Sequence, residues 1–526
     1  MSEQEPASNQ KIAWFGLVAG PMAFLLCVNW LPIEFLKQSG ADTIPTEFTW
    51  AGRGTLGAMA WMGIWWLTEA VHISATALLP IVLFPLLGIA SMDETCFPYS
   101  DPLIYLYLGG FVLALSMERW GLGKRIALQT LRIVGTSGSA MIGGFMLVTA
   151  VLSAFVSNTA TTAMMLPIAL SVVSLVRNRH DSNLEENEDC AASHLSEQKQ
   201  FGSCLLLAIA YSASIGGIAT IIGTPTNAFL VGFLRKDISE PFRYDFSFAS
   251  WLPIGLSFTL LLLPTLYFLL TRVLFQVRNV SIDGGKELID RELSNMGGMK
   301  IGEWNTLIVF CLAVVLWLTR PLLRQWEIHW GDEMIRPLAG IDDSAIAMLG
   351  ALLLFMIPVD LKKREFTMNW QTANKMPWGI LILFGGGLSL ASAIEANGVA
   401  EFIGSQAQSL GELPLIGVVL VVTTTIVFLT ELTSNAATVA SLVPVFAALA
   451  IGLGIHPFML VIPATISASC AFMLPVATPP NAIVFGSGLI SSRQMMRVGF
   501  WLNLISIVYV VLVSMIVIRP WIQAHT

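Results

Sequence analysis

Long apolar runs separated by short polar stretches extend along nearly the whole chain. A helix needs about 20 apolar residues to cross the hydrocarbon core of a bilayer. Together with several less regular segments, the runs predict about eleven membrane-spanning helices, because they are too long and continuous for alternating barrel strands. The clearest runs are residues 14–34, 74–91, 140–156, 251–275, 304–319, 344–358, 415–429 and 499–519.

The composition also indicates a protein embedded in a membrane. Of 526 residues, 55% are hydrophobic and 12% are charged, with a mean hydropathy of +0.72, whereas soluble domains carry roughly 25% charged residues. Residues 1–10 are polar and acidic, and no convincing cleavage site follows the first apolar run, which we expect to be a retained helix. We therefore predict an all-α, multi-pass integral membrane protein of the inner (plasma) membrane.

A polar motif occurs twice inside apolar sequence. Residues 157–163 read SNTATTA and residues 434–440 read SNAATVA, and both fit S-N-x-A-T-x-A followed by proline. Asn158 and Asn435 are 277 positions apart (435 − 158). The same spacing relates Gly109-Gly110 to Gly386-Gly387, which we expect to be points of close helix approach.

A second block is also duplicated. Residues 223–228 read GTPTNA and residues 477–482 read ATPPNA, with a spacing of 254 positions (478 − 224). The shorter spacing is explained by a polar insertion at Arg177–Gln200, present only in the first half. We predict an internal duplication, and about five spans in each half favour two inverted repeats.

Polar segments suggest how the chain is divided. Lysine and arginine concentrate in cytoplasmic loops, so residues 276–303 and the cluster Lys362-Lys363-Arg364 are expected inside, with the N-terminus inside and the C-terminus outside. Arg177–Gln200 and Arg320–Asp343 are expected to be loops outside the membrane. The predicted parts are an N-terminal tail and first helix (1–50), a first repeat (51–275), a cytoplasmic linker (276–303) and a second repeat (304–526).

The motif chemistry fits a transport site. Polar groups at membrane depth are costly unless they line a cavity or bind something. Helix N-termini at a break suit an anion, and unwound carbonyls suit a dehydrated cation. Neither motif block contains arginine or lysine. A bound dianion would therefore need bound cations to neutralise it, which argues for coupling to Na⁺.

The paired SNT-like motifs, the G/A-T-P-x-N blocks and Trp66-Leu67-Thr68-Glu69-Ala70 resemble the divalent anion:sodium symporter family. That family includes sodium-coupled dicarboxylate, citrate and sulfate carriers, and the resemblance covers roughly residues 50–515. It implies two re-entrant hairpins in addition to the spanning helices. It also implies a homodimer in which each protomer has a scaffold and a mobile transport part that moves as an elevator.

The resemblance further implies two sodium sites and one shared substrate site. Ser153 and Thr430, one in each sodium site, are repeat partners 277 positions apart (430 − 153), which supports the assignment independently. The first sodium site would use Ser153, Ser157, Asn158 and the backbone at Gly223, and the second Thr430, Thr433, Asn435 and the backbone at Ala477. The substrate would meet Ser157, Asn158, Thr159, Thr224, Ser434, Asn435, Thr478 and Pro479.

The expected function is Na⁺-coupled symport of C4-dicarboxylates such as succinate, malate or fumarate, with lipid and a second copy of the chain as the other partners. A Na⁺-independent dicarboxylate or tricarboxylate exchanger of the same fold and a sodium-sulfate symporter are the alternatives. A channel would need a continuous pore, and broken helices in a twofold repeat favour alternating access instead. Enzyme and cofactor fingerprints are absent from the sequence, as is any basic-aromatic pattern for nucleic acid.

Two positions near the second motif carry separate hypotheses. Position 436 is alanine where the family usually has threonine, so one hydroxyl that could meet a carboxylate is missing. We hypothesise that C4-dicarboxylates bind more weakly, or that the preference is shifted. Glu431 is the best candidate for a proton-sensing or structural acid, whereas Glu118 and Glu395 are expected at helix ends.

Overall fold

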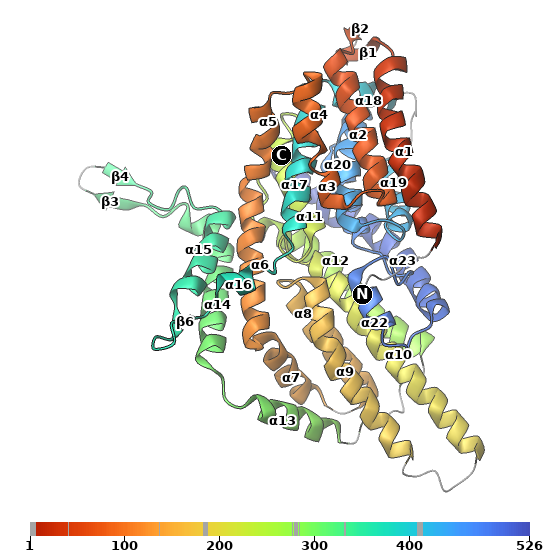
Figure 1. Ribbon diagram of the computed structural model, residues 1–526, viewed down its shortest axis with the longest axis vertical. Coiled ribbons are helices and arrows are strands. Elements are labelled where there is room, and N and C mark those ends of the chain that lie inside the picture. The colour runs from red at the N-terminus through yellow and green to blue at the C-terminus, as the bar shows by residue number, and fades with distance from the viewer. Residues whose placement is uncertain are drawn as a thin grey trace.

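The computed structural model describes residues 7–39, 42–135, 137–181, 188–275, 277, 282, 284–330, 333–407 and 414–525. Helices make up most of this part, with three short antiparallel hairpins (Figure 1). The hairpins are β1 (Glu34–Ser39) with β2 (Asp42–Glu47), β3 (Ile328–Trp330) with β4 (Glu333–Ile335), and β5 (Pro358–Asp360) with β6 (Glu365–Phe366).

The helices follow one another along the chain, and the three hairpins lie in the connections after α1, α14 and α15. Before the linker they are α1 (Ala7–Trp30), α2 (Trp50–Thr68), α3 (Ile73–Thr76), α4 (Leu79–Leu87), α5 (Met92–Cys96), η1 (Phe97–Ser100), α6 (Pro102–Trp120), α7 (Leu122–Val134), α8 (Gly138–Ser153), α9 (Asn158–Asp181), α10 (Glu188–Ile218), α11 (Pro225–Lys236), α12 (Phe248–Phe268) and η2 (Leu269–Leu274). From the linker on they are α13 (Gly285–Met296), α14 (Ile301–Leu323), α15 (Asp343–Met356), α16 (Trp370–Ala373), α17 (Trp378–Ala396), α18 (Val399–Ala407), α19 (Leu415–Leu429), α20 (Asn435–Gly452), α21 (Phe458–Ala468), α22 (Pro479–Phe485), α23 (Ser492–Val513), η4 (Ser514–Ile518) and α24 (Arg519–His525).

The helix lengths confirm an all-α membrane protein. Nine helical segments in the described part of the chain are long and apolar enough to cross a bilayer. Helices α8 and α19 are apolar but have only 16 and 15 residues. Each leads through a short break into a second helix, α9 or α20, as an arm of a re-entrant hairpin would.

The predicted duplication is visible in where the helices begin. The first residues of α7 and α18, α8 and α19, and α9 and α20 are all 277 positions apart (399 − 122, 415 − 138, 435 − 158). Helices α11 and α22 begin 254 positions apart (479 − 225). The α8–α9 pair lies in the lower part of the molecule and the α19–α20 pair in the upper part (Figure 1), as inverted repeats require.

The polar segment Arg177–Gln200 was predicted to be a loop, and this prediction was wrong. Helix α9 continues to Asp181 and α10 begins at Glu188, while residues 182–187 lie outside the described residues. Half of its 24 residues are glutamate, alanine, leucine, glutamine or arginine, which favour helix. Polarity therefore marked the end of the apolar run rather than the end of the helix. The ends of α9 and α10 project together at the bottom of the molecule (Figure 1).

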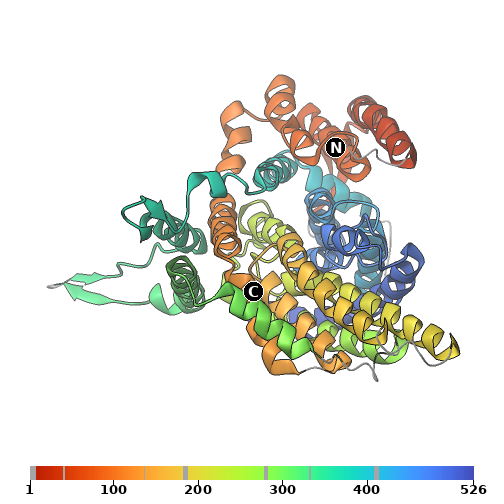
Figure 2. The ribbon, with the colours of Figure 1, turned by 60° about the horizontal axis from the view of Figure 1, so that its bottom comes forward.

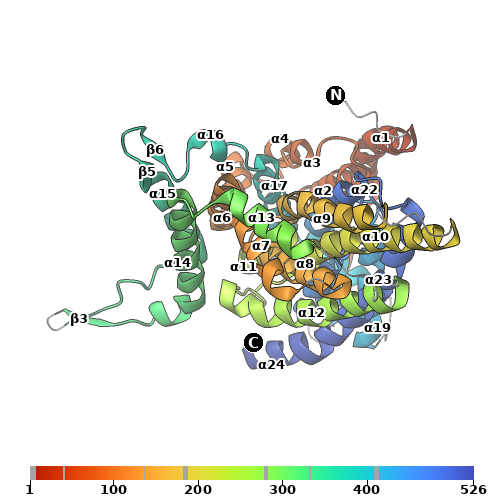
Figure 3. The same cartoon turned by 90° about the horizontal axis from the view of Figure 1, so that it is seen from below.

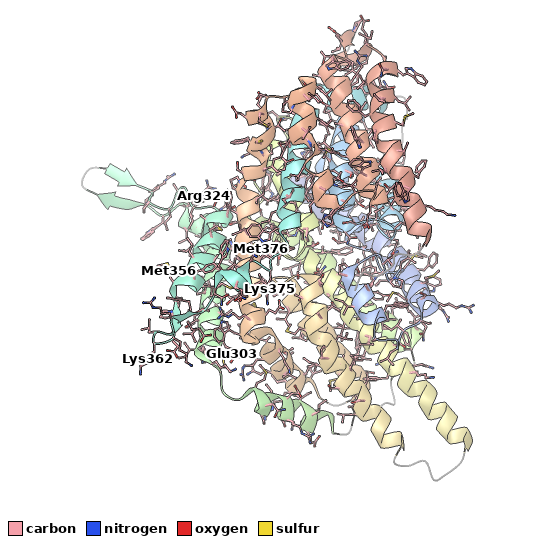
Figure 4. All side chains as sticks on the ribbon, in the orientation of Figure 1. Glu303, Arg324, Met356, Lys362, Lys375 and Met376 are labelled. Carbon is pink, nitrogen blue, oxygen red and sulfur yellow. The ribbon has the colours of Figure 1, made fainter. Side chains whose placement is uncertain are left out.

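The linker and the cluster Lys362-Lys363-Arg364 lie at the same end of the helix pair α14 and α15. Glu303, at the start of α14, and Lys362, after β5, lie toward the lower end, whereas Arg324 lies toward the other end (Figure 4). This agrees with the expectation that the two segments share one side of the membrane. Helices α14 and α15 form a flank of the molecule in the view from below (Figure 3). The β3–β4 hairpin projects from that flank (Figure 2).

The duplicated glycines allow close helix contacts, as expected. A Cβ atom on Gly109 would lie 2.5 Å from the backbone carbonyl carbon of Ala347, so α6 and α15 approach backbone to backbone. A Cβ atom on Gly386 would collide with the carbonyl oxygen of Ala77. Small residues serve this purpose in membrane helix packing.

Ion pairs join the first-half broken helix to the flanking helices. Arg320, in the last turn of α14, lies 3.1 Å from both Asp343 of α15 and Asp245 of the segment before α12. Arg235, in the last turn of α11, lies 2.6 Å from Asp101, which caps α6. These contacts connect α11 and the residues after it with α6, α14 and α15.

Asp237, which follows α11, provides a test of this region. Burial and the neighbouring Asp101 carboxylate raise the pKa of Asp237 to about 8, against the effect of Lys236, Arg243 and Arg235. Since an aspartate in an unfolded chain has a pKa of about 3.9, the folded state holds a proton that the unfolded state releases. The contribution of Asp237 to the free energy of unfolding therefore falls as pH rises from about 4 to 8, and it is constant above pH 8.

We expect Asp237→Asn to remove this pH-dependent loss of stability. The melting temperature of the variant in detergent should exceed that of the native protein by a margin that widens from pH 5 to pH 8 and levels above it. Asp93→Asn, which changes an exposed carboxyl, is the control. A margin that does not change with pH would contradict the prediction.

Candidate functional site

The first motif lies at the break between α8 and α9. Helix α8 ends at Ser153 and α9 begins at Asn158, so four residues cross the break. Ser157 Oγ accepts a hydrogen bond from the Ala160 N–H at 3.3 Å, which stabilises the start of α9. The N–H groups at this helix start lie beside the motif side chains, where an anion is favoured.

Ser153 lies between two oxygen acceptors. Its Oγ is 2.6 Å from Asn158 Oδ1 and 2.7 Å from the Ala213 carbonyl oxygen in α10. A serine hydroxyl has one hydrogen to donate, so only one of these close oxygen pairs can be a hydrogen bond at a time. The surplus of oxygen lone pairs is an arrangement that a hard cation would stabilise.

Two glycines bring backbone oxygens to the same place. A Cβ atom on Gly217 would lie 2.5 Å from Asn158 Oδ1 and 3.1 Å from the Gly223 carbonyl oxygen. A Cβ atom on Gly223 would collide with the Gly217 carbonyl oxygen and lie 3.0 Å from that of Ala154. Amide and carbonyl oxygens thus converge where side chains are absent. Three of the residues predicted for the first sodium site, Ser153, Asn158 and Gly223, are brought together.

The second half repeats the central feature. Thr430 Oγ1 lies 2.7 Å from Asn435 Oδ1 and 2.9 Å from the Ala468 carbonyl oxygen in α21. This is the Ser153 arrangement built from a threonine, with the same single hydrogen between two acceptors. Thr430 and Asn435 are therefore brought together. The Ala477 N–H bonds to the Leu474 carbonyl inside the break before α22.

Thr433 marks a difference between the halves. Its Oγ1 lies 2.7 Å from Thr438 Oγ1 and 3.0 Å from the Leu429 carbonyl oxygen, so its hydroxyl is engaged inside the hairpin. The equivalent first-half residues are Val156 and Thr161, each 277 positions earlier. The Thr161 hydroxyl is buried and has no hydrogen-bond partner within the described part of the chain. A sodium-ligand role for Thr433 remains a prediction.

The proposed substrate residues lie at the two hairpin breaks and the two broken-helix starts. Ser157, Asn158, Ser434 and Asn435 are half-buried, and Thr224 and Thr478 are buried. Thr159 and Pro479 are exposed. Helix α11 packs on α20 and α22 packs on α9, so each broken helix contacts the hairpin of the other half. Their meeting at a single substrate remains a prediction.

Two asparagines outside the predicted site hold the breaks open. Asn227 donates to the Thr220 carbonyl at 2.9 Å, and Asn481 donates to the Leu474 carbonyl at 3.0 Å. These bonds are equivalent, because donors and acceptors are both 254 positions apart (481 − 227, 474 − 220). Both asparagines belong to the duplicated T-P-x-N block, so the repeat itself was the signal that could have identified them.

Two other contacts that support the site could not be identified from the repeat. Tyr107, buried in α6, places its hydroxyl against the carbonyl oxygens of Ile221 and Thr224, the latter at 2.7 Å. Thr220, between α10 and α11, donates a hydrogen bond to the carbonyl of Ala154, between α8 and α9. Both contacts join segments that are distant in sequence and carry no duplicated pattern.

Glu431 is a structural acid at the second break. Its carboxylate accepts hydrogen bonds from the N–H groups of Phe472, Met473 and Leu474 at 2.7–3.0 Å and from Asn503 Nδ2 at 2.7 Å. The side chain is 3% exposed. It connects the α19–α20 hairpin to the break after α21 and to α23. The structural half of the sequence interpretation is thus confirmed.

Comparisons with known proteins agree on one family. The family described as the sodium:sulfate symporter transmembrane region matches residues 40–522. The sodium-dependent dicarboxylate transporter SdcS of Staphylococcus saprophyticus is 39% identical over 507 residues, covering 96% of this chain and 91% of the relative. SdcS of Staphylococcus aureus is 40% identical over 500 residues, covering 95% and 90%.

Solved structures support the fold. The YdaH transporter of Alcanivorax borkumensis has a TM-score of 0.58 at 14% identity, covering 98% of this chain and 99% of that chain. MtrF of Neisseria gonorrhoeae has a TM-score of 0.57 at 12% identity, covering 97% and 95%. At these identities the likeness concerns architecture alone.

We expect Glu431→Gln to destabilise the protein, because an amide cannot replace a carboxylate that accepts from three backbone N–H groups. Hydrogen bonds to a charged group contribute about 1.5–3 kcal/mol each. Glu395→Gln is the matched control, since Glu395 accepts one side-chain bond, from Ser239 at 2.7 Å. Melting curves in detergent should show a clear loss for Glu431→Gln alone. Equal losses for the two variants would contradict the structural role.

Proposed function

Because the chain belongs to the family described as the sodium:sulfate symporter transmembrane region, we propose that it moves C4-dicarboxylates such as succinate, malate or fumarate into the cell together with Na⁺. Its family and the named relatives are transporters, so the chain is a transporter and not an enzyme. The observation that carries the proposal is the duplicated hydroxyl between two oxygen acceptors, Ser153 in one half and Thr430 in the other.

The two hydroxyls support two Na⁺ sites. In each, an asparagine Oδ1 and a backbone carbonyl oxygen lie within 3 Å of the hydroxyl oxygen. Such ligands suit a hard, dehydrated cation. Ser157 and Gly223 would complete the first site, and Thr433 and Ala477 the second.

The substrate would lie between the cations. Its carboxylates would receive hydrogen bonds from the motif side chains and from the N–H groups that begin α9 and α20. The blocks at residues 157–163, 223–228, 434–440 and 477–482 contain no lysine or arginine. Two bound Na⁺ ions would therefore supply the positive charge that a dicarboxylate requires. Binding of the anion without the cations would be unfavourable, which is the physical basis for coupling.

We propose that transport follows an elevator mechanism in a homodimer. The mobile part would consist of the two hairpins, the two broken helices, α12 and α23, and the remaining helices would form the scaffold. Two ion pairs cross between these parts: Arg235 with Asp101, which caps α6, and Arg320 of α14 with Asp245, which precedes α12. They would have to break and re-form as one part moves past the other.

Uptake of labelled succinate into proteoliposomes tests the function. Inward Na⁺, K⁺ and choline gradients are compared, with vesicles either empty or preloaded with succinate. Uptake into empty vesicles only with Na⁺ supports symport. Uptake only into preloaded vesicles, indifferent to Na⁺, would contradict it and establish the exchanger alternative. Competition by sulfate but not by malate would favour a sulfate symporter.

Ser153→Ala and Thr430→Ala should each weaken Na⁺ binding, because each removes one ligand oxygen. The Na⁺ concentration for half-maximal uptake should rise several-fold, about five-fold for a loss near 1 kcal/mol. Ser171→Ala is the control, since that hydroxyl bonds to the Pro167 carbonyl of its own helix at 2.9 Å. An unchanged Na⁺ dependence in both variants would exclude these residues as ligands.

Ala436→Thr tests the departure in the second motif. A restored hydroxyl at the start of α20 should strengthen succinate binding. A hydrogen bond to a charged group contributes about 1.5–3 kcal/mol, so the half-saturating concentration should fall about ten-fold or more. Ala450→Thr, at a buried position later in α20, controls for the added volume. Unchanged succinate affinity and substrate range in Ala436→Thr would contradict the hypothesis that the missing hydroxyl weakens or shifts dicarboxylate binding.

A further inference from the structure

One chain of buried hydroxyls crosses between the two halves of the molecule. Thr224 Oγ1 lies 3.2 Å from Thr226 Oγ1, which lies 2.9 Å from Ser469 Oγ. Thr224 precedes α11, Thr226 is the second residue of that helix, and Ser469 follows α21. The three side chains are 4%, 0% and 2% exposed, so no bulk water replaces these contacts.

The duplication does not account for this bridge. The residue equivalent to Thr226 is Pro480, 254 positions later, which has no hydroxyl. Ala213 and Ala468 make equivalent contacts 255 positions apart (468 − 213), so the residue equivalent to Ser469 is Ser214, whose hydroxyl is buried without a hydrogen-bond partner among the described residues. The bridge therefore occurs once, from the first-half broken helix to the second-half break, and has no symmetric counterpart.

The bridge also makes the two Thr-Pro hydroxyls different. Thr478 Oγ1 accepts from the Asn481 N–H at 3.4 Å and caps α22. Thr224 makes no side-chain cap bond to α11, and its hydroxyl contacts Thr226 instead. The Thr478 hydroxyl thus caps its own helix, whereas the Thr224 hydroxyl contacts Thr226, which in turn contacts the opposite half.

Either oxygen can donate in each of these contacts, and a carboxylate at the Thr224 end would fix the direction. If Ser469 donates to Thr226 and Thr226 donates to Thr224, the Thr224 hydrogen is left for another acceptor. A carboxylate accepts hydrogen bonds and donates none. Donation in series also polarises each hydroxyl and strengthens the last bond.

We propose that Thr226 and Ser469 are positioning residues that orient the Thr224 hydroxyl as a hydrogen-bond donor to a substrate carboxylate. The inference rests on the proposed function, since it takes Thr224 as a substrate contact. It adds a specific role for two residues whose mutual contact is not repeated in the other half. Through them, the second-half break determines how the first half holds the substrate.

Thr226→Val, Ser469→Ala and the double variant test the bridge in proteoliposomes. Valine matches threonine in shape, and each change interrupts the same series of bonds. We expect the succinate concentration for half-maximal uptake to rise about five-fold in each single variant. The double variant should show no further rise, because both changes act through Thr224. The Na⁺ concentration for half-maximal uptake should change less than the succinate value.

The controls separate positioning from folding. Thr465→Val removes a buried hydroxyl on α21 that bonds to the Val461 carbonyl of its own helix at 2.8 Å, and should leave succinate affinity unchanged. Thr226→Ser keeps the hydroxyl and should retain native affinity even if Thr226→Val folds poorly.

Three results would overturn the inference. These are native succinate affinity in both single variants, fully additive losses in the double variant, or equal loss in Thr226→Ser and Thr226→Val. If the native protein takes up succinate with Na⁺ while the variants behave like Thr465→Val, only this inference fails. If the native protein shows no Na⁺-dependent uptake, the proposed function itself fails.

Discussion

A single hydroxyl hydrogen placed between two oxygen acceptors is the constraint on which the site depends. Ser153 and Thr430 each bridge the end of one hairpin helix, the asparagine that begins the next, and a carbonyl of the helix that precedes a Thr-Pro break. Buried polar groups without partners are costly, so these clusters need either a cation or another donor. The hairpin breaks, the close glycines and the asparagines of the Thr-Pro blocks all maintain this geometry.

Duplication provides two such clusters, but the chain does not use them identically. Glu431 fills the second break with a carboxylate, whereas its repeat partner in the first break is Ala154, 277 positions earlier. Thr433 pairs with Thr438, while Thr161 in the first half has a buried hydroxyl without a partner among the described residues. The backbone framework is thus repeated, while the side chains that stabilise it differ.

The parts of the fold that depend on pattern could be predicted from the sequence. The spacing of 277 between Asn158 and Asn435 also relates the starts of three helix pairs, and the pairing of Ser153 with Asn158 follows from their positions across one break. The helical ends around Arg177–Gln200 could not be predicted from polarity, because a helix continues into water when its residues favour helix. Contacts such as Tyr107 with Thr224, or Thr226 with Ser469, depend on three-dimensional packing and leave no periodic trace.

The central claim is that the two oxygen clusters bind Na⁺ ions that travel with the dicarboxylate. Simultaneous measurement of ²²Na⁺ and labelled succinate entering the same proteoliposomes tests it most directly. The account predicts that succinate stimulates Na⁺ entry, with at least two Na⁺ ions for each dicarboxylate, one for each cluster. Succinate entry that leaves ²²Na⁺ flux unchanged would contradict it.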